Sequence, residues 1–238
     1  MKKIFNILAA ITLTTVSAHA ELPVHPDELV YVRHGYILGL NCKERGADWI
    51  TYQTEPDNGK NLPRGTFHHD ADVPKECQQF STRPYGKGFD LGHLRGSNAA
   101  KNDELGMFDA FGMTNILPQN AKLNRGGWLA TERLEECEHN RHTLTMFMGP
   151  VWEGGNTWFV KSHGVRTPGA FWKIMESDER IVAWVMPNAS VPAADIDKYL
   201  TNVAHIETLT GIKFPISEEL KTVAQASSWG DTAHCSFK

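Results

Sequence analysis

The residues that could do chemistry are concentrated in one segment, residues 81–136. His93 follows Asp90-Leu91-Gly92, which we interpret as a glycine-flanked turn. Further along, the asparagine-rich stretch Asn115–Asn124 runs into a helical pattern that carries Glu132 and Glu135. A histidine can accept a proton from water near neutral pH, and a hard cation on oxygen ligands can stabilise charge on a phosphate. The combination predicts metal-assisted hydrolysis of a phosphodiester.

The spacing suggests a role for each polar residue. Asn124, at the start of a predicted helix, could give an oxygen directly to Mg²⁺, which takes few protein ligands and keeps several waters. Glu132 lies eight residues on, about two helical turns, and could face the same side. Asn115 precedes Asn124 across a proline-containing turn, and Arg83 and Arg95 could clamp phosphate oxygens.

Each of these signals is weak when taken alone. A histidine between glycine and leucine is usually structural, and asparagine is common in turns and helix caps. The stretch Phe67–Asp70 contains two histidines and an aspartate, but adjacent histidines on an extended chain point in opposite directions. We interpret that stretch as a solvated loop.

The elements that must position these residues are mostly strands, with helices inserted and appended. This order predicts an α+β fold with a central antiparallel sheet flanked by helices. Strands are predicted at 29–40 (two, with a turn), 49–52, 143–148, 157–160, 170–175 and 181–186, and helices at 97–110 (after a loop), 128–140, 192–209 and 215–228. Gly211 is expected to cap the third helix.

The N-terminus resembles a secretory signal. Lys2 and Lys3 precede an apolar run and the small-residue pattern Ala18-His19-Ala20, so we expect residues 1–20 to be removed and 21–238 to form one domain. The apolar run is too short for a good membrane span, and no other membrane segment is predicted. We therefore expect a periplasmic or secreted protein that has no membrane partner.

Composition limits the ligands that the whole surface could attract. The net charge of the chain is −4, and it becomes −6 without Lys2 and Lys3. Global charge therefore does not favour nucleic-acid binding, and an anionic ligand would need a local basic patch.

The cysteine count favours disulfides. Cys42, Cys77, Cys137 and Cys235 form an even set behind a signal peptide, and none has the spacing of a zinc site. Three pairings are possible and the sequence does not choose among them. We favour Cys42–Cys77 together with Cys137–Cys235.

Four motifs make the chemistry specific. Asp90–His93 corresponds to an Asp-Arg-Gly-His motif, Asn115–Gln119 to Asn-Ile-x-Pro-Gln, and Leu123–Trp128 to Leu-Asn-x-Gly-x-Trp, while Ile206–Ile212 corresponds to Ile-Glu-x-Leu-Thr-Gly-Leu. In these motifs the chain resembles the DNA/RNA non-specific endonuclease family, the endonuclease G-like group of the ββα-metal nucleases. The likeness extends over most of the predicted mature chain.

The resemblance implies a role for each motif residue. His93 would be the general base, Asn124 the direct ligand of Mg²⁺ (with Mn²⁺ as the alternative), and Glu132 would hold water that the cation retains. Asn115 would help to position the site, and Asp90 would orient the His93 turn. The implied fold contains a ββα-metal element, and the implied products carry 5′-phosphate ends.

The chain departs from the family pattern at Leu91, where the motif has an arginine that contacts phosphate. Arg95 could substitute for it, Arg83 resembles an upstream arginine of the family, and Arg125 is expected to face solvent.

The position of the supporting glutamate is ambiguous. Glu132 matches the family by its distance from Trp128, whereas Glu135 follows Leu134 as in the Leu-Glu pair of the family. We prefer Glu132.

The sequence therefore predicts an exported, Mg²⁺-dependent endonuclease that cleaves DNA and RNA with little sequence preference. Two alternatives remain. One is an exported nucleic-acid-binding protein with impaired catalysis, of which Leu91 would be the sign, and the other is a phosphoesterase of small nucleotides. A homodimer and a protein inhibitor are also left open by the sequence.

Overall fold

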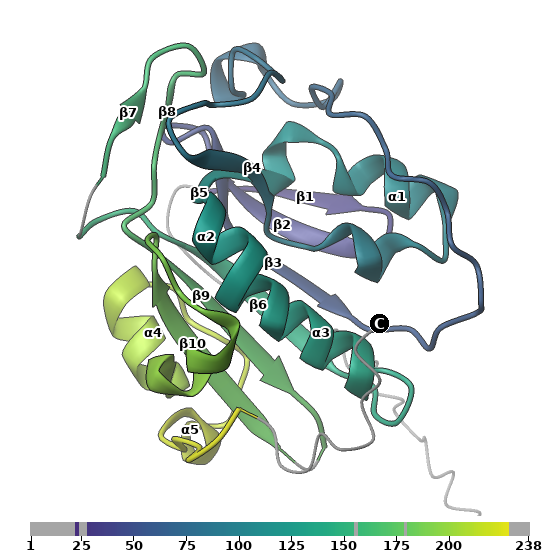
Figure 1. Ribbon diagram of the computed structural model, residues 1–238, viewed down its shortest axis with the longest axis vertical. Helices are drawn as coiled ribbons and strands as arrows, with labels where there is room; N and C mark the ends of the chain where they lie inside the picture. The colour runs from purple at the N-terminus through teal and green to yellow at the C-terminus, as the bar shows by residue number, and fades with distance from the viewer. Residues whose placement is uncertain (1–21, 24–27, 155–156, 179, 229–238) are drawn as a thin grey trace, which may run out of the picture.

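A seven-stranded antiparallel sheet forms the centre of the protein (Figure 1). The structure is a computed structural model that describes residues 22–23, 28–154, 157–178 and 180–228. The predicted signal segment lies outside this range. In spatial order the strands are β1 (Leu29–Arg33), β2 (Tyr36–Asn41), β3 (Gly46–Gln53), β6 (Thr145–Val151), β9 (Ala170–Glu176), β10 (Ile181–Pro187) and β11 (Leu200–Thr201). The predicted α+β architecture is confirmed.

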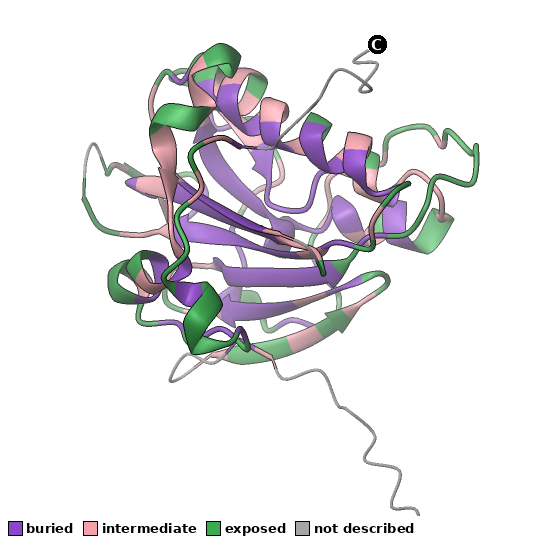
Figure 2. Ribbon diagram, turned by 90° about the horizontal axis from the view of Figure 1, so that it is seen from below, coloured by how far each residue is buried: buried purple, intermediate pink, exposed green. Residues whose placement is uncertain are grey.

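The central strands are buried on both faces because each face carries its own apolar layer (Figure 2). Trp49 and Trp172 pack with helix α4 (Val203–Thr210) on one side. Phe171 and Trp184 belong to the layer on the other side, which includes residues of helix α3 (Leu129–Glu138). Alternation of neighbouring residues between the two layers follows from the two-residue period of a strand.

The shorter elements lie around this sheet. They are α1 (Glu104–Ala110), α2 (Ala121–Leu123) and α5 (Glu218–Lys221), the hairpin of β7 (Phe159–Val160) and β8 (Val165–Arg166), and 3₁₀ turns at Lys75–Cys77, Ser97–Ala100 and Met113–Asn115. Among the residues described, no helix is long and apolar enough to span a membrane.

The helix predicted at 192–209 is wrong as a single element. The structure instead has a 3₁₀ segment (Ala193–Tyr199), strand β11 and then α4. Thr201 pairs with Ala183 of β10, which keeps this part of the chain extended. Asn202 then starts a new helix, with its side chain accepting a hydrogen bond from the backbone N–H of His205. Gly211 caps α4 with a positive φ, as predicted.

A second, two-stranded sheet carries the central motif. The turn predicted around Asp90–His93 is instead strand β4 (Phe89–His93), which pairs with β5 (Ile116–Asn120) in antiparallel register from Phe89 opposite Asn120 to His93 opposite Ile116. Pro118 is tolerated because each strand of a two-stranded sheet has a free edge. β4, β5 and α3 together form the expected ββα element.

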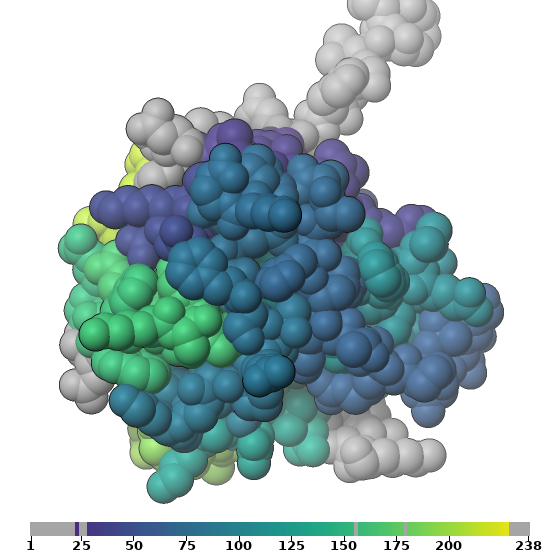
Figure 3. Space-filling model, turned by 90° about the horizontal axis from the view of Figure 1, so that it is seen from above, coloured from purple at the N-terminus to yellow at the C-terminus, as the bar shows by residue number. Residues whose placement is uncertain are grey.

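A long irregular segment, residues 54–88, spreads over the face of the molecule shown in Figure 3, where it is blue. A disulfide between Cys42 and Cys77 ties its far end to strand β2, which confirms the first predicted bridge. The second predicted bridge involves Cys235, which lies outside the described residues. The segment is therefore covalently closed onto the sheet although it has little regular structure.

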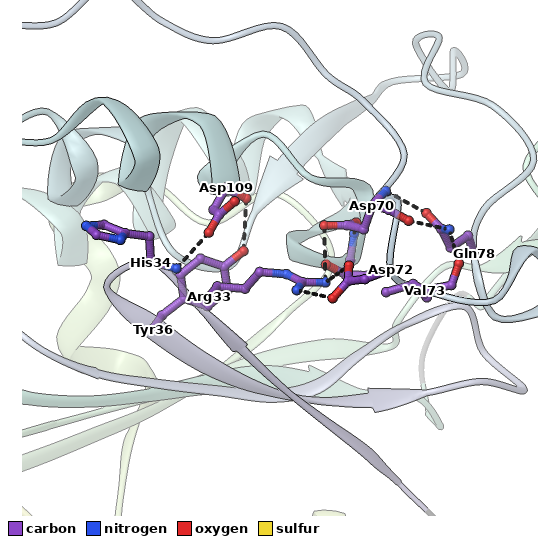
Figure 4. A network of polar contacts seen from close by, with 9 residues as sticks. Arg33, His34, Tyr36, Asp70, Asp72, Val73, Gln78 and Asp109 are labelled. Carbon is purple, nitrogen blue, oxygen red and sulfur yellow. Dashed lines mark hydrogen bonds and ion pairs between the residues drawn. The ribbon is translucent and has the colours of Figure 1, made fainter.

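Polar contacts fix the same segment to the β1–β2 hairpin (Figure 4). The buried guanidinium of Arg33 lies 3.5 Å from Asp70 and 2.8 Å from Asp72. Gln78 donates to the backbone carbonyl of Asp70 at 2.8 Å and accepts from its N–H at 2.8 Å. Asp70 also accepts from the N–H of Thr114, so it links this segment to the 3₁₀ turn that precedes β5.

Candidate active site

A cavity of about 210 Å³ lies between the β4–β5 hairpin, the start of α3 and the irregular segment. Residues from all three of these parts line it. They are Arg64, Leu91, His93, Gly96, Ser97, Asn98, Asn124, Arg125, Leu129 and Glu132. The structure therefore brings together the predicted base, the predicted cation ligand and the preferred glutamate.

His93 is the buried base candidate of this cavity. It is 8 % exposed, its ring lies against those of Phe67 (5.5 Å between centroids) and Phe111 (4.8 Å), and its backbone carbonyl accepts from Trp128 Nε1 at 3.1 Å. Its Nε2 has no hydrogen-bond partner among the described residues. Burial, and then the nearby charge of Arg64, lowers the pKa of His93 to about 3. The imidazole is thus neutral at physiological pH, and one of its ring nitrogens carries a free lone pair.

Asp90 organises the start of the helical segment. Its carboxylate accepts hydrogen bonds from Asn124 Nδ2 (2.9 Å) and from Arg125 Nε (2.9 Å) and Nη2 (2.7 Å). Partial burial raises the pKa of Asp90, but these bonds outweigh burial and lower it overall. The predicted role of orienting the His93 turn needs correction, because the two side chains lie on opposite faces of strand β4. Asp90 orients Asn124 and Arg125 instead.

Asn124 lies where the helix is locally distorted. A π-helical turn (Asn124–Trp128) joins α2 to α3, and Gly126 leaves helical geometry there. A Cβ on Gly126 would lie 2.4 Å from the carbonyl oxygen of Val191, so only glycine allows this close approach. Because Asn124 uses its Nδ2 on Asp90, its amide oxygen is left for the cavity.

The structure separates the two glutamates that the sequence left ambiguous. Glu132 lines the cavity with His93, whereas Glu135 accepts a 2.7 Å hydrogen bond from the hydroxyl of Tyr52 and lines a different cavity. Burial raises the pKa of Glu132 to about 7, although Lys173 acts in the opposite direction. The free carboxyl therefore changes its charge near neutral pH.

Lys173 is a buried cation beneath α3 to which the sequence analysis gave no role. It lies in β9, is 1 % exposed, and places its Nζ 4.2 Å from the centre of the Trp128 ring. Burial lowers its pKa, while Glu132 and Glu135 raise it. A lysine within the apolar run Ala170–Met175 was the signal that could have pointed to buried counter-charges.

Asn115 and Arg95 lie behind the cavity rather than in it. Asn115 is fully buried; its Oδ1 accepts from the backbone N–H of Arg95 (2.9 Å), and its Nδ2 donates to the carbonyls of Arg95 (3.0 Å) and Ala110 (2.8 Å). It fixes the backbone just after His93, which is a positioning role. The guanidinium of Arg95 is buried against Tyr52 (5.1 Å) and donates to the carbonyl of Ala99.

The predicted phosphate contacts therefore need correction. Arg95 cannot clamp a phosphate beside His93, because aromatic packing turns its guanidinium into a second cavity. The side chain of Arg83 is exposed and does not line the cavity. Its backbone is held by two contacts, from its N–H to the hydroxyl of Ser81 (3.2 Å) and between its carbonyl and Nε2 of His163 (2.8 Å).

Arg64 is the functional candidate that sequence reasoning missed. It is exposed, lines the cavity, lies 5.6 Å from the centre of the Phe111 ring, and lowers the pKa of both His93 and Glu132. It belongs to the Pro- and Gly-punctuated loop after β3, and nothing local in that sequence indicates that the loop folds back over the site.

The donor set of the cavity suits a hard divalent cation. The amide oxygen of Asn124 and the carboxylate of Glu132 are oxygen ligands on one wall, the type that Mg²⁺ and Mn²⁺ accept. Within the described part of the chain, no group of three or more His, Cys, Asp or Glu residues is arranged to hold a metal. A cation here would therefore take few protein ligands and keep water.

Comparison with known proteins identifies the class to which this fold and site belong. Residues 17–218 match the DNA/RNA non-specific endonuclease family. The chain belongs to that family, whose members are hydrolases and, in general, metal-dependent nucleases. The resemblance seen in the motifs is confirmed.

Individual relatives agree with this assignment. Mitochondrial endonuclease G of Bos taurus is 27 % identical over 202 residues, covering 76 % of this chain and 67 % of its own length. A nuclease of Nostoc sp. is 26 % identical over 205 residues (79 % and 74 %), and the nuclease of Serratia marcescens is 24 % identical over 195 residues (76 % and 73 %). A crystal structure of the EndoG/EndoGI complex shares the fold, with a TM-score of 0.71 at 18 % identity, over 80 % of this chain and 88 % of that chain.

Proposed function

We propose that this protein is an exported, Mg²⁺-dependent endonuclease that hydrolyses phosphodiester bonds of DNA and RNA without sequence preference. The observation that carries the proposal is the buried imidazole of His93, whose Nε2 is unpartnered among the described residues, in one cavity with the oxygen donors of Asn124 and Glu132. Family membership supports nuclease activity, and the donor set supports the cation.

In the proposed reaction, His93 takes a proton from water as the water oxygen attacks phosphorus. The bond from phosphorus to the 3′ oxygen breaks, and this oxygen takes a proton from water, so the products are a 5′-phosphate and a 3′-hydroxyl. A bound cation supplies charge stabilisation for the phosphate and the leaving oxygen. Arg64 can donate to the same phosphate, and the phosphate then offsets the charge that lowers the pKa of His93. This would remove the smaller of the two effects that lower the pKa of His93, of which burial is the larger.

The low sequence preference follows from what the cavity offers. The cavity offers two arginines, two asparagines and an imidazole that can contact phosphate oxygens or a cation bound to them. Phosphate contacts carry no direct sequence information. The net charge of −4 means that this local arrangement, rather than the whole surface, must attract the nucleic acid.

The test is cleavage of circular DNA and of RNA by the protein with Mg²⁺, with Mn²⁺ and with EDTA. We expect nicking and RNA degradation with either metal and none with EDTA. Binding without cleavage under all conditions would favour the impaired binding protein. Hydrolysis of a dinucleotide with no attack on the plasmid would favour the small-nucleotide phosphoesterase.

Export and inhibition are parts of the same proposal. Export is supported by the signal-like N-terminal sequence and by the Cys42–Cys77 disulfide, since disulfides persist in oxidising compartments. Fractionation of cells that express the full chain tests it. The structural neighbour is a nuclease bound to its inhibitor, which supports a protein inhibitor for this chain as well. A homodimer is tested by the mass of the protein in solution.

A further inference from the structure

We propose that Arg125 contacts the phosphate backbone of the substrate at the mouth of the active-site cavity. This inference rests on the proposed function and adds a specific substrate contact to it. Arg125 lines the cavity beside Asn124, and its side chain is 73 % exposed, so a nucleic-acid strand can reach it. The residue was expected to face solvent without a role.

The guanidinium is held in place rather than free to swing. Its Nε and Nη2 donate to the two carboxylate oxygens of Asp90, and neither bond uses Nη1. Asp90 also accepts from Asn124, so strand β4 and the start of the helical segment are joined at one carboxylate. An arginine paired in this two-bond geometry is pre-organised and still has donors for a phosphate oxygen.

The cavity has few positive charges, so a phosphate contact from Arg125 would contribute much of the attraction for an anionic substrate. Arg64 and Arg125 are the only lysine or arginine side chains among the described residues that line the cavity. Leu91 contributes an apolar wall with no donor, and Arg95 is turned away. Without Arg125, the carboxylate of Asp90 would lose its ion-pair partner beside the path of an anionic backbone. Arg125 thus supplies a donor and also cancels a repulsive charge.

The experiment compares Arg125→Ala with Arg133→Ala, a matched control that removes an exposed arginine of α3 outside the cavity. Affinity for one DNA duplex is measured in EDTA at several salt concentrations, and kcat/KM is measured with Mg²⁺. A charge-assisted contact corresponds to about a 10- to 100-fold loss in affinity and in kcat/KM. Loss of one phosphate contact also reduces the slope of log affinity against log salt by about 0.9. The control should change neither.

One further variant and a binding measurement separate a contact from a structural effect. Leu91→Arg in the Arg125→Ala background places a guanidinium on the same cavity wall, and we expect it to restore much of the affinity. Calorimetric titration with Mg²⁺ should show unchanged cation binding in Arg125→Ala, which establishes that Asn124 is still in place.

Each outcome decides one question. Arg125→Ala with wild-type affinity in EDTA and an unchanged salt slope overturns the inference, even if weaker Mg²⁺ binding lowers its kcat/KM. Cleavage by the wild-type protein decides the proposed function separately, because the duplex-binding measurement in EDTA requires no catalysis. A wild-type protein that binds DNA through Arg125 but does not cleave it would leave this contact standing and remove the nuclease proposal.

Discussion

Glu132 offers a test in which stability and catalysis move in opposite directions. Its pKa of about 7 in the folded protein, against an ordinary value of 4.5, means that the unfolded chain loses this proton first as the pH rises. The free energy of unfolding of the wild type should therefore fall between pH 4.5 and 7 and then level off. In Glu132→Gln the side chain has the same shape and no charge, so its free energy of unfolding should not show this fall.

The magnitude follows from the two pKa values. The difference between these pKa values lowers the free energy of unfolding of the wild type by about 3 kcal/mol at alkaline pH. Because solvent on the open side of the cavity screens this effect, we expect a loss of about 1–3 kcal/mol. In EDTA at pH 8, Glu132→Gln should be more stable than the wild type by that amount. At pH 4 the two should have equal free energies of unfolding. Cleavage with Mg²⁺ should be nearly lost in the variant.

The assay is urea unfolding in EDTA at both pH values, with Glu219→Gln as a control at an exposed glutamate of α5. The control should follow the wild type at each pH. If Glu132→Gln is less stable than the wild type at pH 8, or gains the same stability at pH 4, then burial does not raise the pKa of this carboxyl. The structural account of Glu132 would then be wrong.

Three other predictions follow from the site and the fold. His93→Gln should lower cleavage by about 10²–10⁴-fold while DNA binding and thermal stability stay unchanged, and activity within a few-fold of wild type would refute its role as the base. Lys173→Met removes the cation that lowers the pKa of Glu132, so the rise of kcat/KM with pH should move to higher pH, whereas an unmoved midpoint would show that the two groups do not interact. Replacing Cys42 and Cys77 with serine should lower the free energy of unfolding by about 2–5 kcal/mol in denaturant titrations, and a smaller loss would mean that the bridge adds little to the other contacts of the segment.

The sequence predicts the main sheet and α3 because their patterns are local. Ala170–Met175 is an almost uninterrupted apolar run, and the run forms a strand buried on both faces. The β4–β5 hairpin was not predicted as strands, because Gly92 and Pro118 favour a turn when only neighbours in sequence are considered. Pairing between the two segments determines their extended conformation, and a pairing between residues distant in sequence cannot be predicted from a local pattern.

The same limit applies to the active site. The motifs placed His93, Asn124 and Glu132 in one cavity, as the structure does. They could not show the direction of Arg95, which depends on two tyrosine rings contributed by strands β2 and β3. Nor could they show Arg64, which reaches the cavity through the path of a long loop. Short motifs specify the residues at a reaction centre, whereas its charged surroundings depend on tertiary packing.

The disulfide that closes the irregular segment also limits the freedom of Arg64 before substrate binds. The disulfide joins β2 to the far end of this segment, across 35 residues of chain that include Arg64. Closing such a ring removes conformations that an open loop would explore, and the logarithmic dependence on loop length makes the effect large even for a long loop. The entropy of ordering Arg64 is therefore lost when the protein folds and oxidises, before any substrate arrives. Reduction of this bond would then weaken substrate binding, which raises KM.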